Sequence, residues 1–243
     1  MATSMADEQT QSTEQSTRPA QGDVSTGPDA GLASRWHSFE ERFETNLYGG
    51  ADAPCTVISV SPTSFPQLVL TAVHAVNHTR GGAPKLADRG TGGLVLLLAE
   101  LLGCAAVVVA GTDSGDGNYD AEHPAKVAVT RLLTPPQFLV DIHGMQDRGI
   151  DLELGTGLSD YVPETILNAF NTGIHSLVVA VDVNFNAGGT GTMTRWAQES
   201  GIRACQIEVS ARMRPPNATP VNMENLLDTL THLLLHLKQG PPK

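Results

Sequence analysis

Short apolar runs alternate with amphipathic stretches along most of this chain. Most of the apolar runs are continuous and lack the alternation of a half-exposed strand, which is typical of a sheet covered on both faces. The apolar runs are residues 56–60, 68–73, 104–110, 138–142, 177–183 and 205–209. The helical patterns are residues 91–102, 124–133, 163–172, 192–200 and 223–238. This alternation predicts an α/β fold, a three-layer α/β/α sandwich around a mainly parallel or mixed central sheet.

The beginning of the chain departs from this pattern. Residues 1–34 are rich in Ser, Thr, Gln, Gly and Pro and contain almost no large apolar side chains. Such a segment buries too little apolar surface to offset the entropy lost on ordering. We therefore predict a disordered tail over residues 1–34 and a single α/β domain over residues 35–239.

The charge balance limits the kinds of partner. Fifteen Lys plus Arg stand against 26 Asp plus Glu, which gives a formal net charge of −11. This charge repels phosphate backbones, so we expect no nucleic-acid partner. A small anionic substrate is still compatible, because a few arginines and a metal ion reverse the sign locally.

Cysteine usage and hydropathy indicate the compartment. Cys55, Cys104 and Cys205 lie in or beside apolar runs without CxxC pairing, which favours packing in a reduced compartment over disulfides. The N-terminus is polar and acidic where a signal peptide is basic and then apolar. The longest apolar stretch, residues 94–102, is too short to cross a bilayer. We expect a cytoplasmic protein with no membrane partner, and the sequence leaves homo-oligomerisation open.

Polar residues follow five of the apolar runs. In open α/β sheets the ligand binds outside the carboxyl ends of the strands, so these residues are expected to share one edge of the sheet. The residues are His74, Asp113, His143, Asn184 with Asn186, and Glu208 followed by Arg212 and Arg214.

Two histidines and a carboxylate form a common zinc site with a fourth position open for water. His74 and His143 are the best ligand candidates, and Asp88, 14 residues after His74, is the third. His78 is an alternative to Asp88, since its i, i+4 spacing from His74 suits a helix, although the residues after it are typical of a loop. Glu208 is then placed to act as general base and general acid.

Structural roles compete with these assignments. A histidine is often a hydrogen-bonded structural residue, Asp88 also suits the start of the helix at residue 91, and Glu208 could pair with a neighbouring arginine. Asp141 is assigned to the strand face opposite His143, and so to a supporting or structural role rather than to metal binding. The remaining histidines are expected on solvated or packing faces; they include His123, His175, His232 and His236.

Several segments together resemble the N-formylglutamate amidohydrolase family, which is related in fold to the zinc carboxypeptidases and aspartoacylases. The resemblance runs from about Val57 to Arg214, some two-thirds of the chain. The matching segments are TAVHAVNH, KLADRGTGGL, GDGNYDAEHPAK, VDIHGM, LELGTG and QIEVSARMR. The resemblance implies a zinc carboxypeptidase-like fold and a zinc-dependent amide hydrolase acting on N-acyl amino acids or similar carboxylated amides.

The resemblance also implies a role for each site residue. His74, Asp88 and His143 correspond to the ligands of one Zn²⁺ ion, and Glu208 to the general acid/base. The arginines that hold a substrate carboxylate correspond to Arg148 and Arg214. Asn118, with one arginine, is expected to orient the substrate.

Two departures from the family pattern bear on the substrate. Family members often carry Asp-x-Asn-Arg, whereas here Tyr119 follows Asn118, and Val73 stands where proline usually precedes the first histidine. These changes indicate a divergent member acting on another substrate, such as a peptide or natural-product amide. Two alternatives are kept: a metal-dependent cyclase or transferase on the same site, and a non-catalytic binding protein.

Overall fold

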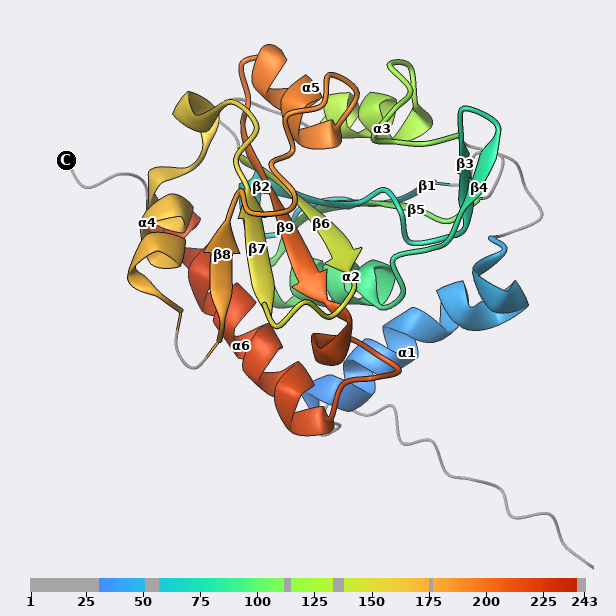
Figure 1. Cartoon of the computed structure of the whole chain (residues 1–243), viewed down its shortest axis with the longest axis horizontal. Coiled ribbons are helices and arrows are strands. Elements are labelled where there is room, and N and C mark those ends of the chain that lie inside the picture. Colours follow the sequence, from blue (N-terminus) through green and yellow to red (C-terminus); the bar gives the residue numbers. More distant parts are fainter. Residues whose placement is uncertain (1–30, 51–56, 112–114, 133–137, 175–176, 240–243) are drawn as a thin grey trace, which may run out of the picture.

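A computed structural model describes residues 31–50, 57–111, 115–132, 138–174 and 177–239. Its main feature is a seven-stranded mixed sheet in the order β1-β5-β2-β6-β9-β7-β8 (Figure 1). The strands are β1 (Val57–Val60), β2 (Phe65–Ala72), β5 (Cys104–Val109), β6 (Phe138–Met145), β7 (Leu152–Gly155), β8 (Val179–Val181) and β9 (Arg203–Ser210). Strands β5, β2, β6 and β9 run parallel, while β1 is antiparallel to β5 and β7 is antiparallel to β9.

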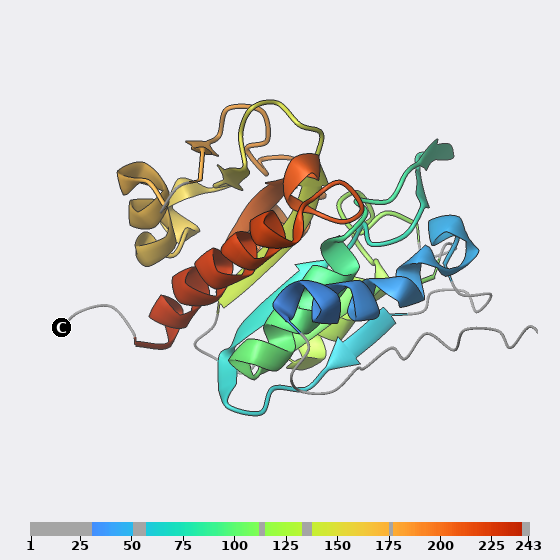
Figure 2. The same ribbon diagram turned by 90° about the horizontal axis from the view of Figure 1, so that it is seen from below.

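Helices cover both faces of this sheet. On one face α3 packs against β5 and β1, and α5 against β9 and β6. On the other face α2 and α6 lie side by side, with α1 packed against both (Figure 2). The helices are α1 (Leu32–Glu44), α2 (Thr91–Leu102), α3 (Pro124–Leu132), α4 (Glu164–Thr172), α5 (Met193–Glu199) and α6 (Pro220–Leu235). The predicted three-layer α/β/α sandwich with a mixed sheet is confirmed.

The predicted elements agree with the structure more closely for helices than for strands. Helix α2 has the bounds that the pattern predicted, and α3, α4 and α5 agree within one residue at each end. The apolar run at residues 177–183 was too long for its strand, since β8 contains three residues. Three features had no predicted counterpart: α1, β7 and a hairpin of β3 (His78–Arg80) and β4 (Ala83–Lys85), where a loop was expected.

Residues 1–30 lie outside the described residues, so the disordered tail stays a prediction. Of the residues assigned to it, Leu32–Ser34 form the start of α1, and Ala33 is buried. Cys104 and Cys205 are free and buried, as expected, whereas Cys55 lies outside the described residues. None of the helices in the described ranges is both long enough and apolar enough to cross a membrane.

Helix α1 approaches the first turn of α2 very closely. A Cβ atom on Gly92 would lie 2.6 Å from the Phe43 ring, and one on Gly93 would lie 2.7 Å from the Glu40 backbone. Only glycine permits this approach. The Gly92-Gly93 pair therefore lets α1 press its buried face, which includes Trp36, onto the end of α2 nearest the sheet's carboxyl edge.

Candidate metal centre

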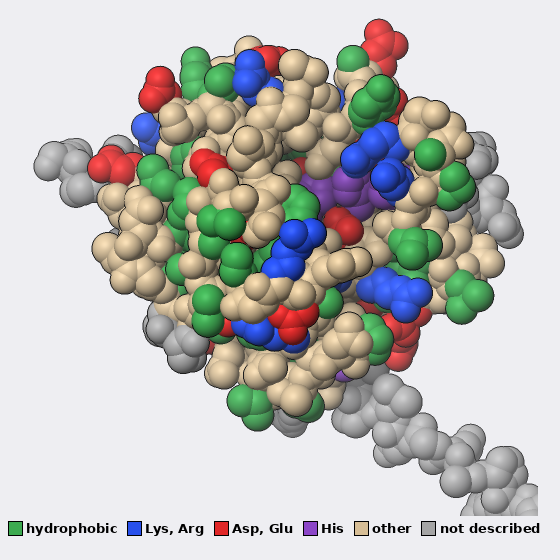
Figure 3. Space-filling model, viewed as in Figure 1, with side chains coloured by type: hydrophobic (Ala, Val, Ile, Leu, Met, Phe, Trp, Pro, Cys, Tyr) green, Lys and Arg blue, Asp and Glu red, His purple; other side chains and the backbone are tan. Residues whose placement is uncertain are grey.

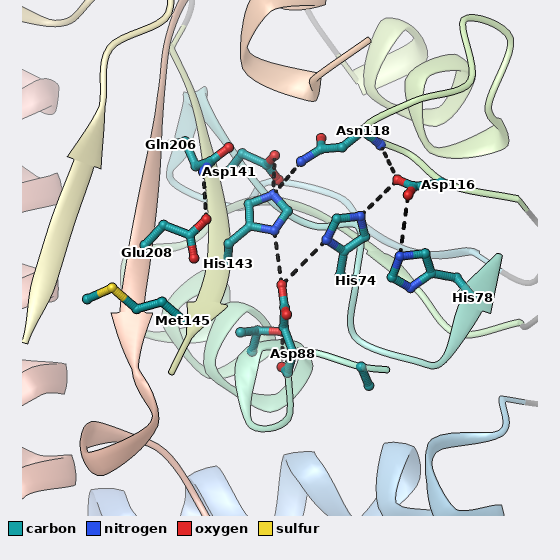
Figure 4. A network of polar contacts seen from close by, with 12 residues as sticks. His74, His78, Asp88, Asp116, Asn118, Asp141, His143, Met145, Gln206 and Glu208 are labelled. Atoms are coloured by element: carbon teal, nitrogen blue, oxygen red, sulfur yellow. Dashed lines mark hydrogen bonds and ion pairs between the residues drawn. The ribbon is translucent and has the colours of Figure 1, made fainter. Parts of the chain in front are cut away.

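His74, Asp88 and His143 meet at the carboxyl edge of the parallel strands. His74 lies two residues beyond the end of β2, His143 lies within β6, and Asp88 lies in the loop that leads into α2 (Figure 4). The two histidines are buried, yet His side chains are visible at the surface of this face, with Lys and Arg side chains around them (Figure 3). The structure thus brings together the three predicted ligands.

The spacing of the ligand atoms suits a tetrahedral ion. Asp88 Oδ2 lies 3.1 Å from His143 Nδ1 and 3.5 Å from His74 Nδ1. Zinc bonds of about 2.0–2.1 Å at tetrahedral angles separate two ligand atoms by about 3.3 Å. Both imidazoles therefore turn Nδ1 toward the Asp88 carboxylate, and the three ligand atoms lie within 4.8 Å of one another, close enough to share one metal ion.

The opposite nitrogen of each ring meets another carboxylate. His74 Nε2 lies 2.9 Å from Asp116 Oδ1, and His143 Nε2 lies 2.8 Å from Asp141 Oδ2. A carboxylate at Nε2 keeps the proton there and leaves the Nδ1 lone pair for a metal. Asp141 is itself held by the Thr71 hydroxyl, which donates to Oδ1 over 2.5 Å.

The prediction that Asp141 lies on the opposite strand face from His143 was wrong. Asp141 and His143 are two residues apart on β6, and side chains two apart on a strand lie on the same face. The supporting role assigned to Asp141 nevertheless agrees with its hydrogen bond to His143. Asp116 was not singled out from the sequence, although it belongs to the quoted GDGNYD segment. Asp113, the residue noted there, lies outside the described residues.

The pKa values of His74, His143 and Asp88 are shifted by burial and by the charges that these groups and their neighbours carry. Burial alone lowers the pKa of His74 and of His143, but the neighbouring carboxylates outweigh it and raise both pKa values above the ordinary range. Burial raises the pKa of Asp88, and its hydrogen bonds with the two histidines more than reverse this, so its pKa is lowered. The carboxylates around the two imidazoles therefore favour positive charge at this site.

Glu208 lies beside the cluster on β9. Its register partner on β6 is His143, so the two residues are neighbours across parallel strands. Burial raises the pKa of Glu208 to about 7, and the charge of His143 opposes that rise. Gln206, two residues earlier on the same face, donates from Nε2 to Glu208 Oε1 over 2.7 Å and fixes the carboxyl group. No arginine pairs with Glu208 among the described residues.

His78 occupies a different position from Asp88. Its ring stacks on His74, with centroids 4.2 Å apart and planes 5° apart, and its Nε2 lies 3.4 Å from Asp116 Oδ2. His74, His78 and Asp116 thus form a second group of metal-binding residue types. In this group, however, Arg80 Nε already donates to Asp116 over 2.6 Å. A cation therefore meets less competition at the Asp88 group than at the Asp116 group.

The Asp88 loop is fixed from two sides. The Asp88 amide donates to the His74 carbonyl over 2.8 Å, which ties the loop to the end of β2. From α1, Glu40 accepts hydrogen bonds from the amides of Gly90 and Gly93, and Trp36 Nε1 donates to the Gly90 carbonyl over 2.8 Å. Glu40 is fully buried, and burial raises its pKa to about 7 against the effect of these amides.

The three predicted substrate contacts lie in three different environments. The Asn118 amide nitrogen lies 2.9 Å from His143 Nε2, and its oxygen accepts from the Met193 amide at the start of α5. Arg148 is exposed; it donates to Asn184 Oδ1 and lies over the Phe185 ring.

Arg214 is buried beneath the site. Its Nε donates to the Val209 carbonyl over 3.0 Å and one terminal nitrogen to the Met145 carbonyl over 3.1 Å; the other terminal nitrogen donates to the Arg89 carbonyl. These bonds hold three chain segments together, so Arg214 has a structural role, and its predicted contact with the substrate stays a prediction.

The other histidines that the structure describes lie on packing or solvated faces, as predicted. His123 is buried and its Nδ1 accepts from the Ala125 amide at the start of α3, while His232 and His236 are exposed. His175 lies outside the described residues.

No protein-family model matches the chain, and no curated protein matches it. Solved structures do resemble it. N-formylglutamate amidohydrolase from Ralstonia eutropha aligns with a TM-score of 0.53 and 12% identity, over 76% of this chain and 97% of that one. A bacteriophage poly-gamma-glutamate hydrolase gives a TM-score of 0.52 at 16% identity, over 78% and 92%.

A gene product of Agrobacterium tumefaciens gives a TM-score of 0.52 at 16% identity, over 83% of this chain and 98% of that chain. At such identities the likeness shows a shared fold. The expected resemblance to N-formylglutamate amidohydrolase is therefore confirmed at the level of the fold.

Proposed function

We propose that the chain is a zinc-dependent amidohydrolase that cleaves an amide bond of an N-acyl amino acid, a peptide or a related carboxylated amide. The observation that carries the proposal is the convergence of His74 Nδ1, His143 Nδ1 and an Asp88 oxygen beside the buried Glu208 carboxyl group. The fold shared with an amidohydrolase and a poly-gamma-glutamate hydrolase supports the same class of reaction.

His74, Asp88 and His143 would hold the ion. Zinc in sites of this composition polarises a carbonyl as a Lewis acid and lowers the pKa of water to about 7. The spacing of the ligand atoms and the carboxylate partner of each imidazole support this assignment of ligands over one that includes His78.

Glu208 would move the proton. Water adds its oxygen to the amide carbon and the C–N bond breaks; the proton that water loses passes to a Glu208 oxygen and then to the leaving nitrogen. Glu208 accepts a proton only when ionised. A neighbouring cation lowers its pKa below the value of about 7 that burial produces, so the carboxylate form is present at neutral pH. Asn118 and Arg148 are proposed to orient the substrate.

The test combines elemental analysis with turnover of a panel of N-acyl amino acids and peptides. The purified wild-type chain is expected to hold one zinc ion, and His143→Ala and Asp88→Asn to lose both zinc and turnover. Glu208→Gln should keep zinc while kcat falls by about 10²- to 10⁴-fold. The exposed Glu199→Gln on α5 serves as the matched control and should keep both.

Two results would contradict the proposal: a wild-type chain that binds no divalent metal, or unchanged turnover in Glu208→Gln. Heavy-oxygen water separates the remaining alternatives. Hydrolysis places one solvent oxygen in the product acid, whereas a cyclase or transferase places none.

A further inference from the structure

Arg89 follows the candidate ligand Asp88 and has an exposed side chain. Its backbone is fixed, because its carbonyl accepts from Arg214 and the next amide, that of Gly90, donates to Glu40. Its guanidinium carbon lies 5.4 Å from the centre of the buried Tyr48 ring. Stacking on an aromatic face leaves the N–H groups at the edge of the guanidinium plane able to bind a carboxylate.

Arg89 differs from the other arginines near the site in having no polar side-chain partner. Within the described ranges, no hydrogen bond or ion pair engages its guanidinium. By contrast, Arg80 is paired with Asp116, Arg212 with Asp147 and Asp151, and the buried Arg214 with backbone carbonyls. In a chain of net charge −11, an unpaired arginine one residue from a metal ligand is a specific feature.

Two hollows meet at this side chain. One, of about 170 Å³, is lined by Arg89, Arg214 and Pro216, with Ala87 beside them. The other, of about 200 Å³, is lined by Arg89 and Pro216 together with Leu47, Tyr48 and the acidic side chain of Glu44. Each volume suits a group of a few heavy atoms, so Arg89 stands between two cavities, one residue along the chain from the candidate ligand Asp88.

The far wall of the second hollow is held in an unusual backbone conformation. Asn46, Leu47 and Tyr48 all have left-handed φ values, of 59°, 52° and 61°. Asn77 stabilises this wall, since its side-chain amide donates to the Leu47 carbonyl and its backbone amide to the Tyr48 carbonyl. The Asn77 side-chain oxygen also accepts from the Ala87 amide, so one residue ties the wall to the Asp88 loop. Strained segments held in this way are frequent at ligand sites.

We infer that Arg89 binds a carboxylate of the substrate and that the hollow lined by Arg89, Arg214 and Pro216, which has no acidic residue in its lining, receives the group carrying that carboxylate. The inference rests on the proposed function for the identity of the site, and it assigns specificity to Arg89 in place of Arg214. A guanidinium–carboxylate contact of this kind discriminates strongly between a carboxylate and its neutral amide.

Calorimetry on the full chain with one equivalent of zinc tests this inference without requiring turnover. The probes are N-acetyl derivatives of glycine, leucine and glutamate, each with a free or an amidated C-terminal carboxylate. Wild-type protein should bind at least one acid about 10-fold or more tightly than its amide. Arg89→Gln should reduce this preference to about two-fold or less, with unchanged affinity for the amide and unchanged zinc content.

The matched control is Arg203→Gln, an exposed arginine at the opposite end of β9, which should keep the wild-type preference. The inference is overturned if wild-type protein binds no probe or shows no acid preference. It is also overturned if Arg89→Gln retains the preference, if it weakens acid and amide equally, or if Arg148→Gln alone removes the preference. Acid-selective binding without hydrolysis would reject the proposed function while supporting the role of Arg89.

Discussion

The candidate ligands are held by two different kinds of structure. His74 and His143 are placed by strands β2 and β6, and each ring is turned by a carboxylate at its Nε2, from Asp116 or Asp141. Asp88 lies in a loop, which one backbone hydrogen bond ties to the end of β2 and which Glu40 and Trp36 of α1 hold from the other side. The comparison teaches that the sheet fixes two ligands through local geometry, whereas the third also depends on a helix about 50 residues earlier in the chain.

The largest effect is expected from Glu40 on α1, in the pH dependence of the free energy of unfolding. A buried carboxyl group whose pKa is raised from 4.5 to about 7 stabilises the fold below pH 4.5, and this stability is lost as the pH rises through about 7. The difference corresponds to about 3 kcal/mol. In zinc-free protein, Glu40→Gln should therefore flatten the fall in unfolding free energy between pH 4.5 and 7, measured by urea denaturation.

The exposed Glu199→Gln provides the control for this measurement, because its side chain is about half exposed and far from α2. Parallel pH profiles for wild type and Glu40→Gln would show that Glu40 is ionised throughout this range. The role of α1 in holding the Asp88 loop would then need another explanation.

A smaller effect is expected on the strand side. Asp141→Asn replaces a charged acceptor at His143 Nε2 by a neutral one, so the imidazole becomes a weaker ligand. Zinc affinity should fall by about 10- to 100-fold, measured by competition with a chelator. Asp228→Asn on α6 is the exposed control and should bind zinc like wild type. Equal zinc affinities in Asp141→Asn and Asp228→Asn would mean that the carboxylate at His143 Nε2 does not support the ligand.

The smallest effect is expected one contact further from the ion. Thr71→Val keeps the shape of a fully buried side chain and removes its hydrogen bond to Asp141. The loss of one hydrogen bond costs about 1 kcal/mol, which corresponds to about five-fold in zinc affinity if the bond acts through His143. Competition with the same chelator measures it. A change in thermal stability with unchanged zinc affinity would mean that Thr71 supports the strand and not the ligand.

The sequence predicted the strand side of the site and missed much of the helix side. Parallel strands bring their carboxyl ends to one edge, so His74, His143 and Glu208 could be grouped without knowledge of the strand order. Asp116 lies in a loop, and only its contact with His74 reveals its role.

Glu40 could not be predicted for a different reason. It is a glutamate on the buried face of an amphipathic helix, where sequence patterns place apolar residues, and its partners are backbone amides of glycines that carry no chemical signature. Arg89 was overlooked likewise, because the cavities that distinguish it are formed by segments distant in sequence.

The hydrogen bonds between α1 and the start of α2 also have a thermodynamic consequence. If docking of α1 favours the arrangement of Asp88 that binds zinc, then zinc must favour docking of α1 by the same free energy. Removal of zinc would thus increase local opening of residues 32–44, and amide hydrogen exchange there would report the occupancy of a metal site that this helix does not touch. The N-terminal helix would act as a remote reporter of the state of the active site.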